Sequence, residues 1–84
     1  MTDIREIKKF LLRALNRAAG TPMPDGSLDS AAKDGIAPRP LQSDIDQAKR
    51  ELETSGLVVG TDDDITGRAW ALSTKGELKA KQLG

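Results

Sequence analysis

The chain contains no cysteine and no histidine, and its 84 residues include only one tryptophan and one phenylalanine. The lack of cysteine excludes disulfide bonds and thiolate catalysis, and it is typical of proteins in a reducing cytoplasm. Without histidine the chain also lacks imidazole acid–base catalysis and the Cys/His ligand sets of zinc sites. We therefore expect a cytoplasmic protein with no catalytic residues, no metal and no cofactor.

Long hydrophobic runs are missing too. No apolar run approaches 18 residues and the N-terminal segment lacks a signal-peptide pattern, so we expect no membrane association. The segment "GTPMPDG" lacks the Gly-Lys-Ser/Thr of a phosphate-binding loop. The run Asp62–Asp64 lacks the alternate spacing of a calcium loop, and a solvated turn is the simpler interpretation. An enzyme is not expected.

The length and the charge distribution limit what the chain can bind. We expect one small domain over residues 1–84. The formal charge is zero, but it is uneven: residues 1–20 carry five basic and two acidic side chains, residues 21–56 four and seven, and residues 57–84 four of each. This balance gives no overall attraction to nucleic acid, so such binding would need a local patch.

Hydrophobic periodicity predicts helices at about 3–19, 27–34, 41–55 and 74–83. The first has the widest apolar stripe, formed by Ile4, Ile7, Leu11, Ala14, Leu15 and Ala18. The second is short, with Ser27 as its expected cap, and its composition is also compatible with disorder. The third has Pro40 in its first turn and a narrow stripe of Leu41, Ile45, Ala48 and Leu52.

Turn residues organise the second half of the chain. Gly56 is expected to end the third helix in a left-handed conformation, with Leu57 folding back on it. Residues 57–73 are predicted to form a hairpin, because two β-prone runs flank a glycine- and aspartate-rich turn. The core is expected to contain Leu11, Leu15, Ile45, Leu52, Leu57, Trp70 and Leu72.

Gly76 is unexpected in the first turn of the last helix, where glycine costs about 0.5–1 kcal/mol relative to alanine. Ser73 is expected to end the preceding strand and cap this helix. We predict that Gly76 allows the helix to approach a neighbouring backbone closely. The alternative is that Gly76 simply weakens a frayed C-terminal helix.

These segments resemble a known family. "LQSDIDQAKRELETSGLV" followed by a hairpin resembles winged helix-turn-helix domains, and "WALSTKGELKAKQL" is similar to the Y-x-L-T-x-x-G-x-x-x-L signature that closes the wing in MarR-type and PadR-type regulators. Trp70, Leu72, Ser73 and Gly76 match the aromatic, leucine, threonine and glycine, and Ala80 or Leu83 a later apolar position. The resemblance, over residues 21–84, implies a mainly α fold: a three-helix bundle, a two-stranded wing and a short C-terminal helix.

The resemblance also implies a transcription regulator or DNA-associated domain whose third helix enters the major groove. Helical geometry places Ser43, Asp46, Gln47 and Arg50 opposite the core stripe. We expect Arg50 to bind guanine and Gln47 adenine. Further phosphate contacts are expected from residues near the helix start and from the base of the wing: Arg39, Gln42, Ser43 and Arg68.

Acidic residues oppose this function. Asp46 lies within the proposed DNA face and Asp62–Asp64 at the wing tip, so a single copy should bind double-stranded DNA weakly and a homodimer is expected. The alternative is a protein–protein interaction or assembly module that does not bind DNA. Its partner would contact Phe10 and Leu12, which flank the stripe of the first helix, although both residues are also candidates for the core.

Overall fold

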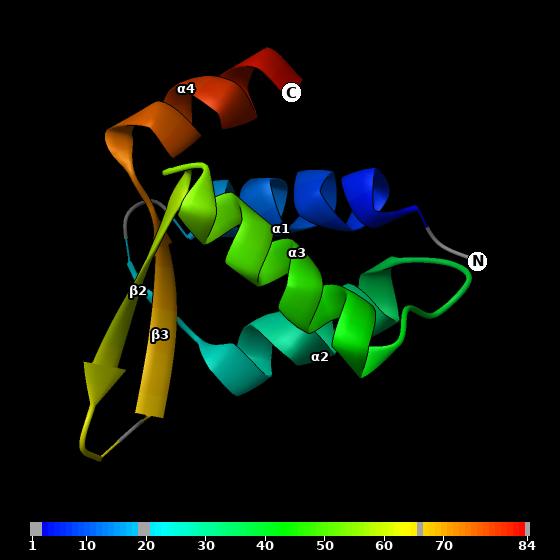
Figure 1. Cartoon of the computed structure of the whole chain (residues 1–84), viewed down its shortest axis with the longest axis horizontal. Helices are drawn as coiled ribbons and strands as arrows, with labels where there is room; N and C mark the ends of the chain where they lie inside the picture. Colours follow the sequence, from blue (N-terminus) through cyan, green and yellow to red (C-terminus); the bar gives the residue numbers. More distant parts are fainter. Residues whose placement is uncertain (1–2, 19–20, 66, 84) are drawn as a thin grey trace.

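The chain consists of helices and short strands in a computed structural model that describes residues 3–18, 21–65 and 67–83. Four helices and three strands are described: α1 (Ile4–Arg17), β1 (Met23–Pro24), α2 (Asp25–Gly35), α3 (Gln42–Thr54), β2 (Val58–Asp63), β3 (Gly67–Leu72) and α4 (Thr74–Leu83). The first three helices lie together, with the β2–β3 hairpin along one side and α4 beyond its root (Figure 1). The expected mainly α fold with a small sheet is therefore confirmed.

The sheet has three antiparallel strands in the order β1–β3–β2. The predicted hairpin is confirmed, with Val58 opposite Leu72 at its root and Asp63 opposite Gly67 near its tip. The expectation of only two strands is wrong, because Met23 and Pro24 pair with β3. Two residues that include a proline give no strand signal in a sequence. In this sheet β2 is an edge strand.

The core forms around α1. Its buried residues include Ile7, Leu11, Leu12 and Leu15, because α1 contacts α2, α3, α4 and β3. Five predicted core residues are confirmed as buried: Leu11, Leu15, Ile45, Leu52 and Trp70. Leu57 and Leu72 are only partly buried and pack against this cluster.

Three expectations at the starts of α2 and α3 are wrong. α2 begins at Asp25, with Pro24 at the N-cap position, so the prediction that Ser27 caps it is wrong. α3 begins at Gln42, which leaves Pro40 outside its first turn. Leu41 is the N-cap residue of α3 and is 63% exposed, so its predicted place in the core stripe is also wrong. Residue 19, predicted to end the first helix, lies outside the described residues.

The end of α3 follows the prediction. Gly56 has a φ of 76°, in the left-handed region. The Gly56 amide donates to the Glu53 carbonyl and the Leu57 amide to the Leu52 carbonyl, each at 3.0 Å. This pair of hydrogen bonds closes the last turn and directs the chain into β2.

Gly76 has the predicted packing role. A Cβ on Gly76 would overlap the carbonyl oxygen of Leu57, so alanine cannot replace it without a backbone shift. Ser73 caps α4, because its Oγ accepts from the Gly76 amide at 3.0 Å and donates to the Gly56 carbonyl at 2.5 Å. These contacts fix α4 against the turn between α3 and β2. In the described part of the chain, no helix has the length and apolar character needed to cross a membrane.

Candidate functional site

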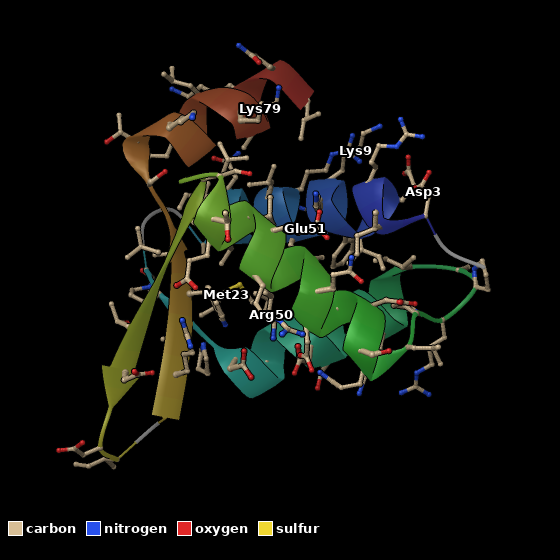
Figure 2. All side chains as sticks on the ribbon, viewed as in Figure 1. Asp3, Lys9, Met23, Arg50, Glu51 and Lys79 are labelled. Carbon is tan, nitrogen blue, oxygen red and sulfur yellow. The ribbon has the colours of Figure 1, made fainter. Side chains whose placement is uncertain are left out.

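The two faces of α3 differ sharply. Ile45, Ala48 and Leu52 are fully or almost fully buried. Ser43, Gln47 and Arg50 are exposed on the other side of the helix, and Arg50 is labelled on α3 in Figure 2. The helix therefore presents the predicted polar face to solvent, because its stripe of three apolar residues covers only one side.

A shallow hollow of about 680 Å³ runs along this face, lined by Lys8, Ser43, Gln47, Arg50, Glu51, Thr54 and Ser55. Within it, Lys8 Nζ lies 2.7 Å from Glu51 Oε1, and Gln47 Nε2 donates to Glu51 Oε2 at 2.8 Å. These two hydrogen bonds lower the pKa of the Glu51 carboxyl, and the bond from Lys8 has the larger effect. Gln47 is thus held by Glu51 and must leave it to bind a base.

Gln42 and Arg39 lie at the start of α3. Gln42 Nε2 donates at 3.0 Å to both Asp29 Oδ2 and Asp46 Oδ1, so its amide group already has two carboxylate acceptors. Arg39 is exposed in the loop between α2 and α3. Neither residue lines the hollow along α3, so the structure does not bring them together with Gln47 and Arg50 in one pocket.

Arg68 lies opposite Asp62 near the tip of the hairpin, so its predicted place at the base of the wing is wrong. Its guanidinium lies 4.5 Å from the centroid of the Trp70 ring and pairs with Glu53 at 2.9 Å. A smaller hollow of about 270 Å³ contains Arg68 and Arg50 together, with Asp25, Asp46, Lys49, Glu53 and Trp70. Arg50 thus lines both hollows and links Arg68 to the polar face of α3.

An ion cluster around the buried Lys49, formed with Asp25, Asp29 and Trp70, supports this second hollow. Lys49 is 3% exposed, and its ammonium pairs with Asp25 at 2.6 Å and also with Asp29. The Trp70 indole donates to the same Asp25 oxygen at 2.6 Å. The sequence analysis missed this cluster, although Asp25 and Asp29 stand four residues apart, which places them on one helix face.

The charge state of Asp25 follows from these contacts. Partial burial alone would raise the pKa of its carboxyl, but the hydrogen bonds from Lys49 and Trp70 oppose this effect. The positive charges of Lys49 and Arg68 add to them, so the pKa lies below its ordinary value of 3.8. Asp25 is therefore a carboxylate at neutral pH, and it fixes the positions of Lys49 and Trp70 below the two arginines.

Arg50 differs from the other cations near α3. Its Nε donates at 3.5 Å to the main-chain carbonyl of Asp46 in the same helix. Among the residues that the structure describes, it forms no ion pair with a carboxylate, whereas Lys8, Lys49 and Arg68 each do. Of the predicted DNA-contacting residues, Arg50 is thus the exposed cation on α3 that is available to a ligand.

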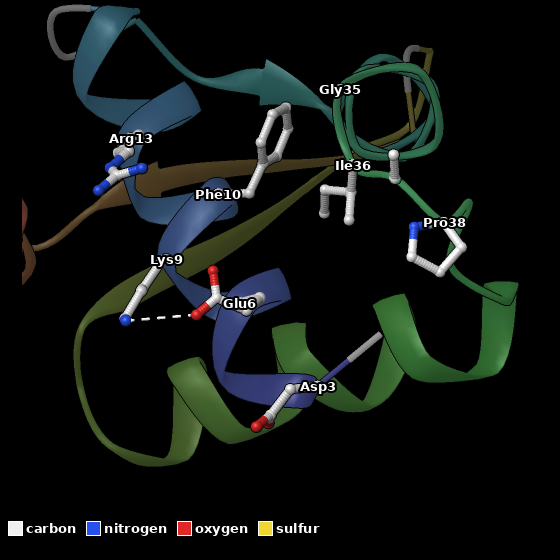
Figure 3. A pocket seen from close by; sticks show the side chains of 9 residues that line it. Asp3, Glu6, Lys9, Phe10, Arg13, Gly35, Ile36 and Pro38 are labelled. Atoms are coloured by element: carbon white, nitrogen blue, oxygen red, sulfur yellow. Dashed lines mark hydrogen bonds and ion pairs between the residues drawn. The ribbon is translucent and has the colours of Figure 1, made fainter. Parts of the chain in front are cut away.

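Phe10 lies on another side of the molecule, in a hollow of about 420 Å³ between α1 and the end of α2. Its ring packs against Gly35, and Ile36 and Pro38 face the same space (Figure 3). Leu12, by contrast, is only 3% exposed. The prediction that Leu12 contributes to a partner surface is wrong, because α1 is enclosed by several elements and turns Leu12 into the core.

The acidic hairpin tip stays solvated. Asp62 and Asp64 are exposed, and no group of three or more acidic side chains that could hold a metal is found among the described residues.

Comparisons of the chain with protein-family models, with curated proteins and with solved structures found no match. The site is therefore interpreted from its own geometry and charges.

Proposed function

We propose that this protein is a small winged-helix DNA-binding domain, a transcription regulator or DNA-associated accessory domain, whose α3 enters the major groove of duplex DNA. The order of three helices followed by a hairpin supports this function, since it is the order that the resemblance implies. The observation that carries the proposal is Arg50, which is exposed on α3 and has no acidic partner among the described residues.

The residues on the outer face of α3 suit different contacts. Arg50 can donate two hydrogen bonds to guanine, and Gln47 can pair with adenine once it leaves Glu51. Ser43 and Arg39 are exposed and suit phosphate oxygens. Gln42 and Arg68 would have to exchange carboxylate partners for phosphate, so we assign them weaker contributions than the sequence alone implies.

Nearby carboxylates limit the affinity. Asp46, Glu51 and Glu53 line the two hollows that Arg50 shares, and further acids occupy the hairpin tip. Each phosphate contact contributes about 0.9 to the slope of log affinity against log salt. With so few unpaired cations, one copy should show a shallow slope and weak binding, and two copies on adjacent half-sites should bind more tightly.

A duplex-binding titration tests the proposal. The wild type, Arg50→Ala and the control Arg17→Ala are titrated with a duplex selected from a random pool, at about 50 mM and 200 mM salt. Arg17 is an exposed arginine at the end of α1 and does not line either α3 hollow. We expect binding to weaken with salt, Arg50→Ala to lose about 1–3 kcal/mol, and Arg17→Ala to match the wild type.

The acidic tip gives a second test of the same function. Replacing Asp62 and Asp64 by asparagine removes two negative charges from exposed positions. If these acids oppose phosphate, the variant should bind the duplex several-fold more tightly at low salt, with less difference at high salt. No binding of either protein at low salt would overturn the DNA proposal.

The second candidate function is a protein-interaction module that does not bind DNA. The hollow at Phe10 favours it, since it combines an aromatic ring with Ile36 and Pro38 at the surface. The rim of this hollow carries both charge signs, including Glu6, Lys9 and Arg13. This function predicts no duplex binding, and a co-purifying protein that is lost with Phe10→Ser but retained with Arg50→Ala.

A further inference from the structure

A groove of about 410 Å³ lies where α4 meets the start of the hairpin, lined by Ser55, Leu57, Lys75, Leu78, Lys79 and Gln82. On α4 the lining residues follow the spacing of one helix face, while Gly76 and Ala80 are buried on the opposite face. Leu57 and Leu78 make the floor apolar, and Leu78 is 59% exposed. We call this the α4 groove.

Two lysines give the α4 groove a positive rim. Lys75 donates at 3.3 Å to the main-chain carbonyl of Ser55, and Lys79 is exposed. Neither lysine forms an ion pair with a carboxylate among the residues that the structure describes. The groove therefore fits an apolar side chain with carboxylates close beside it.

The hairpin tip has this chemistry. Ile65 is 93% exposed, which is the largest exposure among the exposed large apolar residues of the described chain. Asp62 and Asp64 are exposed next to it. An exposed isoleucine directly after a run of aspartates is not needed for a turn, for which small polar residues suffice. The tip and the α4 groove thus have matching apolar groups and opposite charges.

We infer that the α4 groove binds the hairpin tip of a second copy of this chain. Ile65 of one copy lies between Leu57 and Leu78 of the next. The carboxylates of Asp62 and Asp64 then pair with the ammonium groups of Lys75 and Lys79. The interaction does not involve Arg50, so it is tested separately from the Arg50→Ala duplex titration.

The geometry requires two copies. The α4 groove adjoins the first residue of β2 and the tip follows its last residue, so the two sites are separated by the length of a six-residue strand, about 20 Å. Figure 1 shows the tip and α4 at opposite ends of the hairpin. A tip cannot reach its own groove, and the contact is head-to-tail. Such contacts extend into an open chain unless the rotation between copies closes a ring.

The contact area is small, so we expect a dissociation constant of roughly 0.1–1 mM and strong weakening by salt. Sedimentation equilibrium measures the average mass of the whole chain up to about 1 mM, at low and at high salt. The mass of the wild type should rise with concentration at low salt and return towards the monomer at high salt.

Paired charge reversals identify the two surfaces. The tip variant Asp62→Lys/Asp64→Lys and the groove variant Lys75→Glu/Lys79→Glu should each remain monomeric at low salt. An equimolar mixture should associate again, because each variant supplies the charge that the other now requires. The control is Lys81→Glu, a charge reversal on α4 but outside the groove. It is matched to the single variant Lys79→Glu, and it should associate as the wild type does.

The apolar contact is tested separately by Ile65→Ser, which keeps the charge and should reduce association by several-fold. Circular dichroism checks that each variant is folded, since every charge-reversed side chain is exposed. A wild type that stays monomeric at about 1 mM in low salt overturns the inference. So does a mixture of the tip and groove variants that stays monomeric. Neither outcome bears on the duplex titration, which depends on Arg50.

Discussion

Lys49 and Arg50 are adjacent cations on α3 and line the same small hollow, yet they differ in burial and in their carboxylate partners. Lys49 is 3% exposed, pairs with Asp25 and Asp29 of α2, and lies 6.0 Å from the centroid of the Trp70 ring. Arg50, about 100° further around the helix, is exposed and contacts a carbonyl of its own helix. One cation holds three elements together, and the other is available to a ligand.

This difference shows that the role of a charged side chain depends on whether a neighbouring element places opposite charges beside it. α2 begins at Asp25 and thereby presents two carboxylates, one turn apart, to α3. A buried ammonium is tolerated only when such partners replace its hydration. Carboxylates also line the hollows around Arg50, but within the described residues none of them forms an ion pair with it, so its charge remains in water. We therefore expect the inner face of α3 to control stability and the outer face to control binding.

The largest effect is expected from the apolar part of the inner face. Leu52 is 3% exposed within the central cluster, so Leu52→Ala should lower the free energy of unfolding by about 2–5 kcal/mol. A domain of this size has little stability to lose. Urea denaturation followed by Trp70 fluorescence measures the change. A curve like that of the wild type would mean that Leu52 is not in the core.

A somewhat smaller effect is expected from Lys49→Met, which keeps most of the side-chain volume but leaves Asp25 and Asp29 without their cation. Both carboxylates are partly exposed, at 41% and 15%, and regain some hydration. We therefore expect a loss of about 1–3 kcal/mol, less than for a fully buried pair. An unchanged urea midpoint would show that the ion cluster contributes nothing to stability. Lys49 and Arg50 would then not differ in their contribution to the fold.

The pH dependence of this loss sharpens the comparison. The folded-state pKa of Asp25 is depressed below 3.8, so the stability it contributes is present above that value and is lost as the pH falls through the lower folded pKa. In Lys49→Met this carboxyl lacks its strongest partner and protonates more readily. The stability difference between wild type and variant, measured in urea, should therefore shrink from pH 7 to pH 3. An equal difference at both pH values would exclude charge as the cause.

The sequence predicted the parts of the fold that depend on local chemistry. The period of Ile45, Ala48 and Leu52, the left-handed Gly56 and the close approach at Gly76 each have a signal within a few residues, and the structure agrees. The prediction that Leu41 belongs to the core stripe was wrong, because periodicity does not show where a helix begins. Here Leu41 is the N-cap residue and turns outward.

The parts that depend on distant residues were not predictable. The role of Lys49 has no local signal in the sequence, because its partners lie 20 and 24 residues away on another helix. Leu12 could have faced either a partner or the core until α1 was seen to be enclosed. Likewise Gln42 and Arg68 looked available for phosphate, but α2 and α3 supply the carboxylates that hold them. Arg50 alone among the α3 candidates keeps its charge unpaired within the described residues.

The smallest effect on stability is expected from Arg50→Met, the outer-face counterpart of Lys49→Met with the same change of charge. Because Arg50 is exposed and its Nε makes only a long bond to the Asp46 carbonyl, the free energy of unfolding in urea should stay within about 0.5 kcal/mol of the wild type. Duplex binding should nevertheless fall, since a base contact is lost. A loss of stability as large as that of Lys49→Met would make Arg50 a structural residue. The DNA-binding proposal would then lose its main support, even if binding also fell.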